Sequence, residues 1–115
     1  MALSIEHIGE IDQVVGDWCL ARVPAHLKQS VDYDYEIDGQ AVTILEVRPA
    51  WRGTPGEVTR RPIARFRFIK VTGFWKIFWM RSSGKWHAYE PMFEVNDLVD
   101  ALDVIETDHY GCFFG

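Results

Sequence analysis

The chain has 115 residues, of which 48% are hydrophobic and 25% charged. That length suits one domain with a single hydrophobic core, and the composition excludes intrinsic disorder, collagen and low-complexity sequence. The net charge of −5 at first argues against nucleic acid or an anionic membrane as a partner. There is no basic secretion signal at the N-terminus and no apolar run of membrane-spanning length. We therefore expect one soluble, cytoplasmic domain spanning residues 1–115.

The first segment predicts a helix that begins after Ser4 and ends before Pro24. Ser4 is a favourable N-cap, and the residue before a proline is pushed out of the helical region. One face of this helix is apolar, because apolar residues recur at three- and four-residue spacing. These residues are Ile5, Ile8, Ile11, Val15, Trp18 and Cys19.

The pattern then changes to strict alternation, which is typical of a strand with one buried face. Residues 31–37 alternate apolar and acidic side chains, Asp38-Gly39 favours a tight turn, and residues 41–47 return as a second strand. A two-residue turn places Tyr33, Tyr35 and Ile37 on one face with Val42 and Ile44. It places Asp32, Asp34 and Glu36 on the other face with Thr43 and Leu45.

Residues 48–61 are rich in glycine, proline and arginine, and we expect them to form a long functional or mobile loop. A meander of three strands follows at 63–70, 74–81 and 85–90, with turns at Thr72-Gly73 and Ser83-Gly84.

Two-residue turns in this meander predict a core face and an outer face. The core face carries Ala64, Phe66, Phe68, Trp75, Ile77, Trp79, Trp86 and Ala88. The outer face carries Arg65, Arg67, Lys76, Phe78, Met80, His87 and Tyr89. A slip of one residue at either turn would reassign part of these two sets.

The last element is a helix over about 97–107 with Asn96 as its N-cap. Its buried stripe is predicted to be Leu98, Ala101, Leu102 and Ile105, and the apolar tail 110–115 is expected to dock. The fold class is therefore α+β: an N-terminal helix, a five-stranded, mostly antiparallel meander sheet, and a C-terminal helix packed on the aromatic sheet face. The competing arrangement is a strongly curled half-barrel sheet around one helix.

Several sequence segments carry a family resemblance from the first acidic hairpin to the C-terminus. They are Glu46-Val-Arg-Pro-Ala-Trp51, Pro62-Ile-Ala, Trp75-Lys-Ile-Phe-Trp-Met80, Lys85-Trp-His-Ala-Tyr-Glu-Pro91 and Tyr110-Gly-Cys-Phe-Phe-Gly115. With these segments the chain resembles the small bacterial proteins grouped as the domain of unknown function 3024 family. The resemblance implies a size and a bacterial origin, but no reaction and no catalytic residues.

The charges are strongly segregated along the chain. Residues 48–89 hold ten basic side chains and one acidic, a charge of +9, whereas the remaining residues carry −14. The net charge therefore does not exclude an anionic partner. A basic, aromatic sheet face resembles the surfaces that bind single-stranded nucleic acid. The candidate binding residues are Arg48, Trp51 and Arg52 in the loop, and Arg65, Arg67, Lys76, Phe78, His87 and Tyr89 on the sheet.

A competing interpretation is that this basic face is neutralised within the fold, with Asp32, Asp34 and Glu36 pairing with Arg65 and Arg67. His87 could act as a general base, although a structural hydrogen-bonding role is the simpler reading. A metal site is a weak alternative that would use Cys19, His26, His109 and Cys112.

The leading functional hypothesis is a non-enzymatic binding module for an anionic partner, either single-stranded nucleic acid or an acidic protein surface. The sequence carries none of the common nucleotide-cofactor, P-loop, nucleophile-elbow or zincin motifs, and we predict no cofactor. One alternative is a homodimer in which acidic helices of one copy face the basic sheet of another. The other is a small enzyme or ligand-binder centred on His87, Tyr89 and Arg65.

Overall fold

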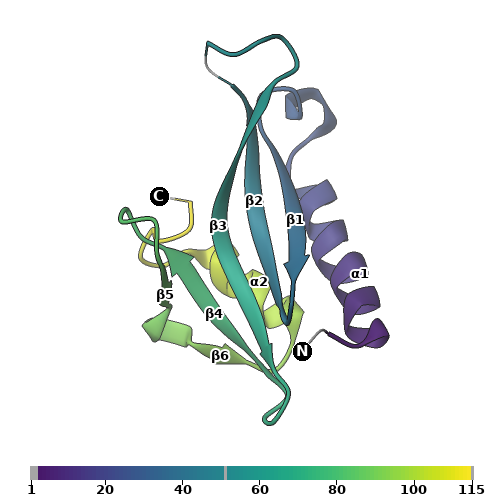
Figure 1. The fold of residues 1–115 in the computed structure, drawn as a ribbon, viewed down its shortest axis with the longest axis vertical. Helices are drawn as coiled ribbons and strands as arrows, with labels where there is room; N and C mark the ends of the chain where they lie inside the picture. The colour runs from purple at the N-terminus through teal and green to yellow at the C-terminus, as the bar shows by residue number, and fades with distance from the viewer. Residues whose placement is uncertain (1–2, 51, 115) are drawn as a thin grey trace.

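The computed structural model describes residues 3–50 and 52–114, which form an antiparallel sheet with two α-helices on one side (Figure 1). The helices are α1 (Ile5–Arg22) and α2 (Leu98–Thr107), with short 3-10 helices at η1 (Ala25–Leu27) and η2 (Glu90–Met92). The strands are β1 (Asp32–Asp38), β2 (Ala41–Pro49), β3 (Val58–Ile69), β4 (Phe74–Met80), β5 (Trp86–Ala88) and β6 (Glu94–Val95). The predicted α+β class is confirmed.

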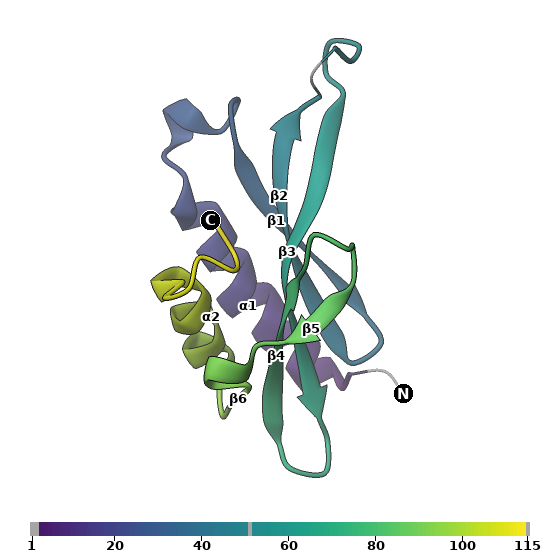
Figure 2. The ribbon, with the colours of Figure 1, turned by 90° about the vertical axis from the view of Figure 1, so that its left-hand side faces the viewer.

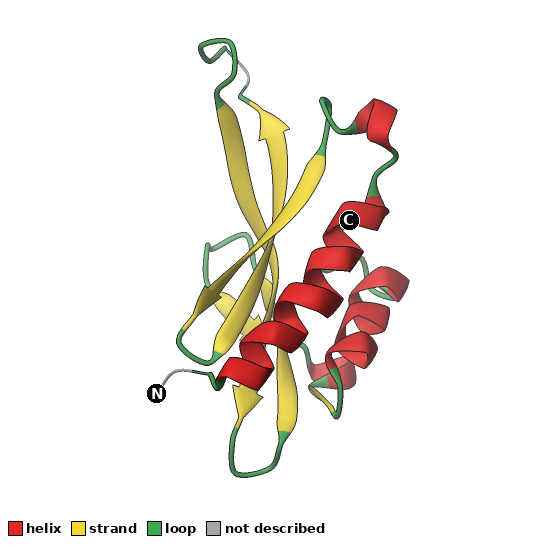
Figure 3. Ribbon diagram, turned by 90° about the vertical axis from the view of Figure 1, so that its right-hand side faces the viewer, coloured by secondary structure: helices red, strands yellow, loops and turns green. Residues whose placement is uncertain are grey.

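The sheet is an open meander in the order β1-β2-β3-β4-β5, and the short β6 also pairs with β4. Two opposite side views place α1 and α2 on the same face of this sheet (Figures 2 and 3). The half-barrel around a single helix is therefore not the arrangement adopted. In the part of the chain that the structure describes, no helix is long and apolar enough to cross a membrane.

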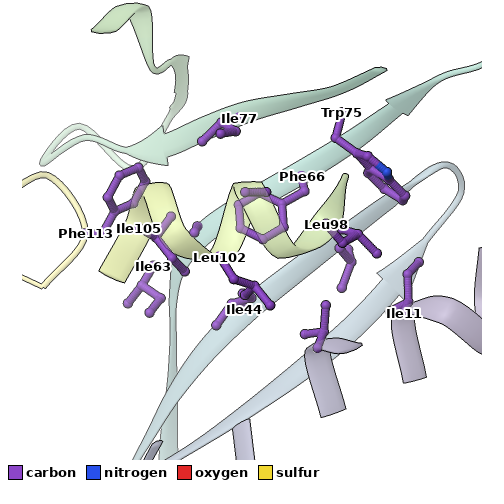
Figure 4. Close-up of a cluster of buried hydrophobic side chains, with 14 of the residues drawn as sticks. Ile11, Ile44, Ile63, Phe66, Trp75, Ile77, Leu98, Leu102, Ile105 and Phe113 are labelled. Carbon is purple, nitrogen blue, oxygen red and sulfur yellow. The ribbon is translucent and has the colours of Figure 1, made fainter. Parts of the chain in front are cut away.

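The core lies between the helices and the sheet (Figure 4). The buried stripe of α2 is the predicted one, and α1 contributes Ile11, Val15 and Cys19. Phe66, Trp75 and Ile77 from the central strands are almost completely buried against them. Burying each aromatic ring contributes several kcal/mol, since each removes on the order of 150–250 Å² from water.

Helix α1 begins and ends where its sequence signals place it. The Ser4 hydroxyl oxygen accepts a hydrogen bond from the His7 backbone N–H at 3.2 Å, and Val23 before Pro24 has extended backbone. Helix α2 differs by one residue, because Asp97 rather than Asn96 is the N-cap.

The β1–β2 hairpin has the predicted faces, but its two turn residues are Gly39 and Gln40 rather than Asp38 and Gly39, since Asp38 pairs with Ala41. Tyr35 lies opposite Ile44 and Ile37 opposite Val42, so the apolar side chains share a face. Gly39 in the turn has a φ of +59°, a backbone conformation that few residues other than glycine adopt readily.

The predicted long loop at 48–61 is wrong in its extent, because both neighbouring strands continue into it. Cross-strand pairing runs as far as Pro49 opposite Val58, which leaves only residues 50–57 as the connection. The β2–β3 hairpin therefore stands beyond both α-helices, at the top of Figure 1. The register shifts beside Ile63, and this bulge accommodates Pro62, which has no N–H to donate.

The turns of the second meander are longer than the predicted two residues, with different consequences. Between β3 and β4, Ile69 pairs with Phe74, so the loop has four residues and every predicted face is kept. Between β4 and β5, Met80 pairs with Trp86, and the Arg81 N–H donates to the Lys85 carbonyl oxygen at 3.0 Å. This three-residue loop exchanges the two faces of β5, which corrects the predicted positions of Trp86, His87, Ala88 and Tyr89.

The C-terminal tail docks as expected. Phe113 is 3% exposed and belongs to the core, while Phe114 is half-buried against it.

Candidate anion-binding face

The candidate site lies on the face of the sheet opposite the helices, which we call the outer face. Alternation along paired strands places its side chains from β3, β4 and β5 together. They are Arg65, Arg67, Lys76, Phe78, Met80, Trp86 and Ala88.

A depression of about 480 Å³ is hollowed into this face, and we call it the basin. Its wall on one side is the β1–β2 turn, residues 38–41. Arg65 and Arg67 from β3 line it, with Phe78 from β4 and Trp86 from β5. The basin therefore combines two guanidinium groups with two aromatic rings, and its volume is in the range of small-molecule sites.

The two arginines of the basin differ in how far they are already neutralised. The Arg65 guanidinium lies 3.8 Å from the Asp38 carboxylate, which is almost fully exposed, and its carbon lies 6.0 Å from the centre of the Trp86 ring. The Arg67 side chain has no hydrogen bond or ion pair with any residue that the structure describes. Exposed ion pairs contribute little. Much of the basic charge in the basin is thus available to a ligand.

Lys76 lies beside the basin and already has two neighbours from β6 and the segment before it. Its ammonium lies 3.7 Å from the Glu94 carboxylate and 4.9 Å from the centre of the Phe93 ring. Phe93 also contacts Phe78 edge-to-face, with 5.7 Å between ring centres.

The acidic side chains of β1 pair with other cations than the expected ones. The Arg60 guanidinium lies 3.0 Å from the Asp34 carboxylate and 3.3 Å from that of Glu36, while Lys28 binds Asp32 at 3.2 Å. The expected pairing of these acids with Arg65 and Arg67 is therefore wrong. Arg60 reaches them because β3 begins at Val58, five residues before the predicted start at Ile63, so Arg60 lies across β2 from these acids.

The structure separates His87 and Tyr89 from Arg65. His87 lies opposite Trp79, and Tyr89 is 3% exposed with its ring 4.9 Å from that of Phe113. Burial raises the pKa of the Tyr89 phenol. His87 and Tyr89 are thus on the helix side of the sheet, and the three residues do not form one site.

Sequence reasoning missed Trp86, which lies on the outer face where His87 was expected. The sequence signal for this position was the glycine at position 84, at the end of the loop, which in the structure has a φ of +81°. A glycine in this conformation at the end of a loop is typical of three-residue hairpins. Reading Ser82-Ser83-Gly84 as such a loop would have placed Trp86 on the outer face.

The arginines of the β2–β3 hairpin lie away from the basin. The Glu46 carboxylate is 2.8 Å from the Arg48 Nε and 3.5 Å from the Arg61 guanidinium, and it accepts a hydrogen bond from the Tyr33 hydroxyl at 3.4 Å. Burial alone would raise the pKa of Glu46, but the hydrogen bond from Arg48 and the charge of Arg61 outweigh it and lower that pKa. Arg52 is exposed in the connecting loop, and Trp51 lies outside the described residues.

Comparison with known protein families identifies the family of this chain. The model of the family described as domain of unknown function (DUF3024) matches residues 4–115. The chain belongs to this family. No curated protein and no solved structure matches the chain, so membership in the domain of unknown function 3024 family identifies no activity.

The four residues of the weak metal alternative do not come together in this family member. Among residues 3–50 and 52–114, no group of three or more His, Cys, Asp or Glu side chains could hold a metal ion. Cys19 lies on the buried face of α1, and burial raises the pKa of its thiol to about 12. Burial also raises the pKa of Cys112. Neither thiol has the lowered pKa that is typical of a reactive cysteine.

Proposed function

We propose that this domain is a non-enzymatic binding module that uses its outer face to bind an anionic partner. The observation that carries the proposal is the basin, where Arg65 and Arg67 lie with Phe78 and Trp86 in one depression. A concave site concentrates the electric field of its charges and partly excludes water, so its arginines attract an anion more strongly than scattered surface arginines do.

The state of the two arginines supports this proposal over a purely structural sheet exterior. Asp38 is the one acid among the described residues that line the basin, and it lies at 3.8 Å from Arg65, longer than a good charge-assisted hydrogen bond. Arg67 has no partner among the described side chains. A phosphate or carboxylate could therefore bind Arg67 without first displacing an internal ion pair.

The arrangement gives less support to an enzyme centred on His87, Tyr89 and Arg65. Those groups lie on opposite faces of the sheet, and no shared substrate could touch all three. The hydroxyl of Tyr89 also belongs to a buried side chain.

The proposal predicts a salt-dependent complex that needs the two basin arginines. A fluorescently labelled single-stranded oligonucleotide at low ionic strength serves as the polyanion, with binding followed by fluorescence anisotropy. Replacing both residues, Arg65→Ala with Arg67→Ala, is expected to weaken binding by about tenfold or more, because charge-assisted hydrogen bonds are lost. Added salt is expected to weaken wild-type binding steeply, because counterion release drives it.

The matched control removes two positive charges elsewhere. Lys70 and Lys85 lie in the turns of the second meander, are exposed, and have no ion pair with a described residue. Lys70→Ala with Lys85→Ala changes the net charge equally and should weaken binding by less than about threefold, since the basin is intact. Equal losses in the two double variants would contradict a basin-centred site.

A further inference from the structure

We infer that the basin is a subsite for one base of single-stranded nucleic acid, with the base stacked on Trp86 and the adjoining phosphate at Arg67. This inference rests on the proposed function and specifies its partner. Free phosphate, an acidic peptide and a nucleic acid would all use the arginines. Only the nucleic acid also uses the two rings.

The first step of the argument is the position of the aromatic rings. The three-residue loop before β5 turns Trp86 onto the outer face opposite Met80, and Phe78 lies opposite Ala88 on the same face. Both rings line the basin and are only half-buried. Aromatic side chains on an open sheet face are the platforms on which proteins stack the bases of single strands.

The second step concerns Arg65, which joins the charged and aromatic parts of the basin. Its guanidinium carbon lies 6.0 Å from the centre of the Trp86 ring, within the range of a cation–π contact. A planar guanidinium beside an indole offers a base a second flat surface. Asp38 partly neutralises Arg65, so this end of the basin is suited to an uncharged base rather than to a phosphate.

The third step concerns the phosphate. Arg67 follows Arg65 by two positions, so both side chains leave the strand on the same face, roughly 6.6 Å apart along it. The Arg67 side chain is exposed and has no ion pair or hydrogen bond with a described residue, whereas Lys76 opposite it on β4 already pairs with Glu94. This is the part of the basin with the least neutralised positive charge. The Asp38 carboxylate on the wall can accept a hydrogen bond from a base N–H group, such as N3–H of thymine, but repels phosphate.

The test compares a labelled decathymidylate with an oligomer of the same length and charge in which every base is absent. We expect the base-containing strand to bind wild-type protein about 5- to 100-fold more tightly at the same low salt, which is the range for stacking one base. The preference should disappear in Trp86→Leu and remain in Trp86→Phe, because phenylalanine preserves a stacking surface. Circular dichroism of both variants checks the fold, and the wild-type comparison itself needs no variant.

Three results would overturn the inference. One is equal binding of the two oligomers by wild-type protein, and another is a base preference that survives in folded Trp86→Leu. The third is binding of a polyglutamate peptide of equal charge as tight as that of decathymidylate, which would point to an acidic protein partner. In each case salt-dependent binding that needs Arg65 and Arg67 would leave the proposed function standing. That proposal fails separately if none of the three polyanions binds.

Discussion

Asp108 holds the end of the chain in place with one side chain. It follows α2 with a φ of 43°, a left-handed conformation that aspartate tolerates better than most residues. Its carboxylate accepts hydrogen bonds from the backbone N–H groups of Phe113 at 3.0 Å and Phe114 at 2.8 Å. A negative charge at a helix C-terminus is unfavourable. Two charge-assisted hydrogen bonds offset that cost and seat Phe113 in the core.

Replacing Asp108 should therefore release the tail. We expect Asp108→Ala to lower the free energy of unfolding by about 2 kcal/mol, because two partly buried backbone donors lose their acceptor. Urea denaturation followed by tryptophan fluorescence measures this change. Asp103→Ala is the matched control on the exposed side of α2, where the change should stay within about 0.5 kcal/mol. Equal effects of the two substitutions would show that Asp108 acts only through its charge.

At the scale of elements, α1 packs on β1 through a glycine in the middle of the helix. A Cβ at Gly16 would lie 3.5 Å from the Tyr35 hydroxyl oxygen and 3.6 Å from its ring, which is ordinary van der Waals contact. The same hydroxyl donates a hydrogen bond to Asp12 at 2.7 Å, and this bond raises the pKa of Tyr35 to about 12. The helix and strand thus meet closely without requiring a glycine.

We therefore predict that Gly16→Ala raises the free energy of unfolding by about 0.5–1 kcal/mol, because alanine loses less backbone entropy in a helix. Gly84→Ala tests the opposite case in the β4–β5 loop. Its φ of +81° is strained for alanine, so we expect a loss of about 1–2 kcal/mol. The midpoint of thermal unfolding should rise in Gly16→Ala and fall in Gly84→Ala. A lower midpoint for Gly16→Ala would mean that Tyr35 cannot accept the added methyl group.

At the scale of the whole molecule, Arg22 connects both ends of the chain. Its guanidinium carbon lies 4.0 Å from the Phe114 ring centre and 5.1 Å from those of Trp18 and Tyr33. It also forms an ion pair with Glu106 of α2. One side chain thus joins α1, β1, α2 and the C-terminal tail, which are far apart in sequence.

Loss of this connection should destabilise the entire fold. We expect Arg22→Ala to lower the free energy of unfolding by about 2 kcal/mol, since a mostly buried cation loses its ring contacts and its ion pair. Arg22→Lys should lose less, because it keeps the charge but not the planar group. Chemical denaturation of Arg22→Ala, Phe114→Leu and the double variant gives their coupling energy. Additive effects would show that these two residues act independently.

Charge is also segregated across the whole molecule. Residues 90–108 hold seven acidic side chains and no lysine or arginine, and they include α2 on the helix side of the sheet. The basin arginines lie on the opposite face. A contact between acidic helices of one copy and the basic outer face of another would therefore be head-to-tail, which gives rings or open chains rather than a two-fold dimer. The predicted homodimer would need a different contact to close.

The candidate site shows where sequence reasoning succeeded and where it stopped. Arg65, Arg67 and Phe78 share the predicted face. The loop between β3 and β4 has four residues instead of two, and a difference of two residues leaves every side chain on the same face of the sheet. His87 and Tyr89 were assigned to the wrong face by a single residue in the next loop. The same shift of one residue placed Trp86 on the core face in the prediction, although it lies on the outer face. Loop length is poorly specified by local sequence. An error of one residue in a loop assigns every side chain of the following strand to the wrong face.

The sequence by itself determined the features that depend on neighbouring residues. These are the bounds of α1, the buried stripe of α2 and the faces of β1 and β2, because side-chain periodicity and capping act within a few positions. Only the tertiary structure decided the reach of the β2–β3 hairpin, the register of β5 and the choice of Arg60 rather than Arg65 as partner of Asp34. Those features depend on contacts between segments distant in sequence, where packing and ion pairing select among registers that the local pattern leaves equivalent.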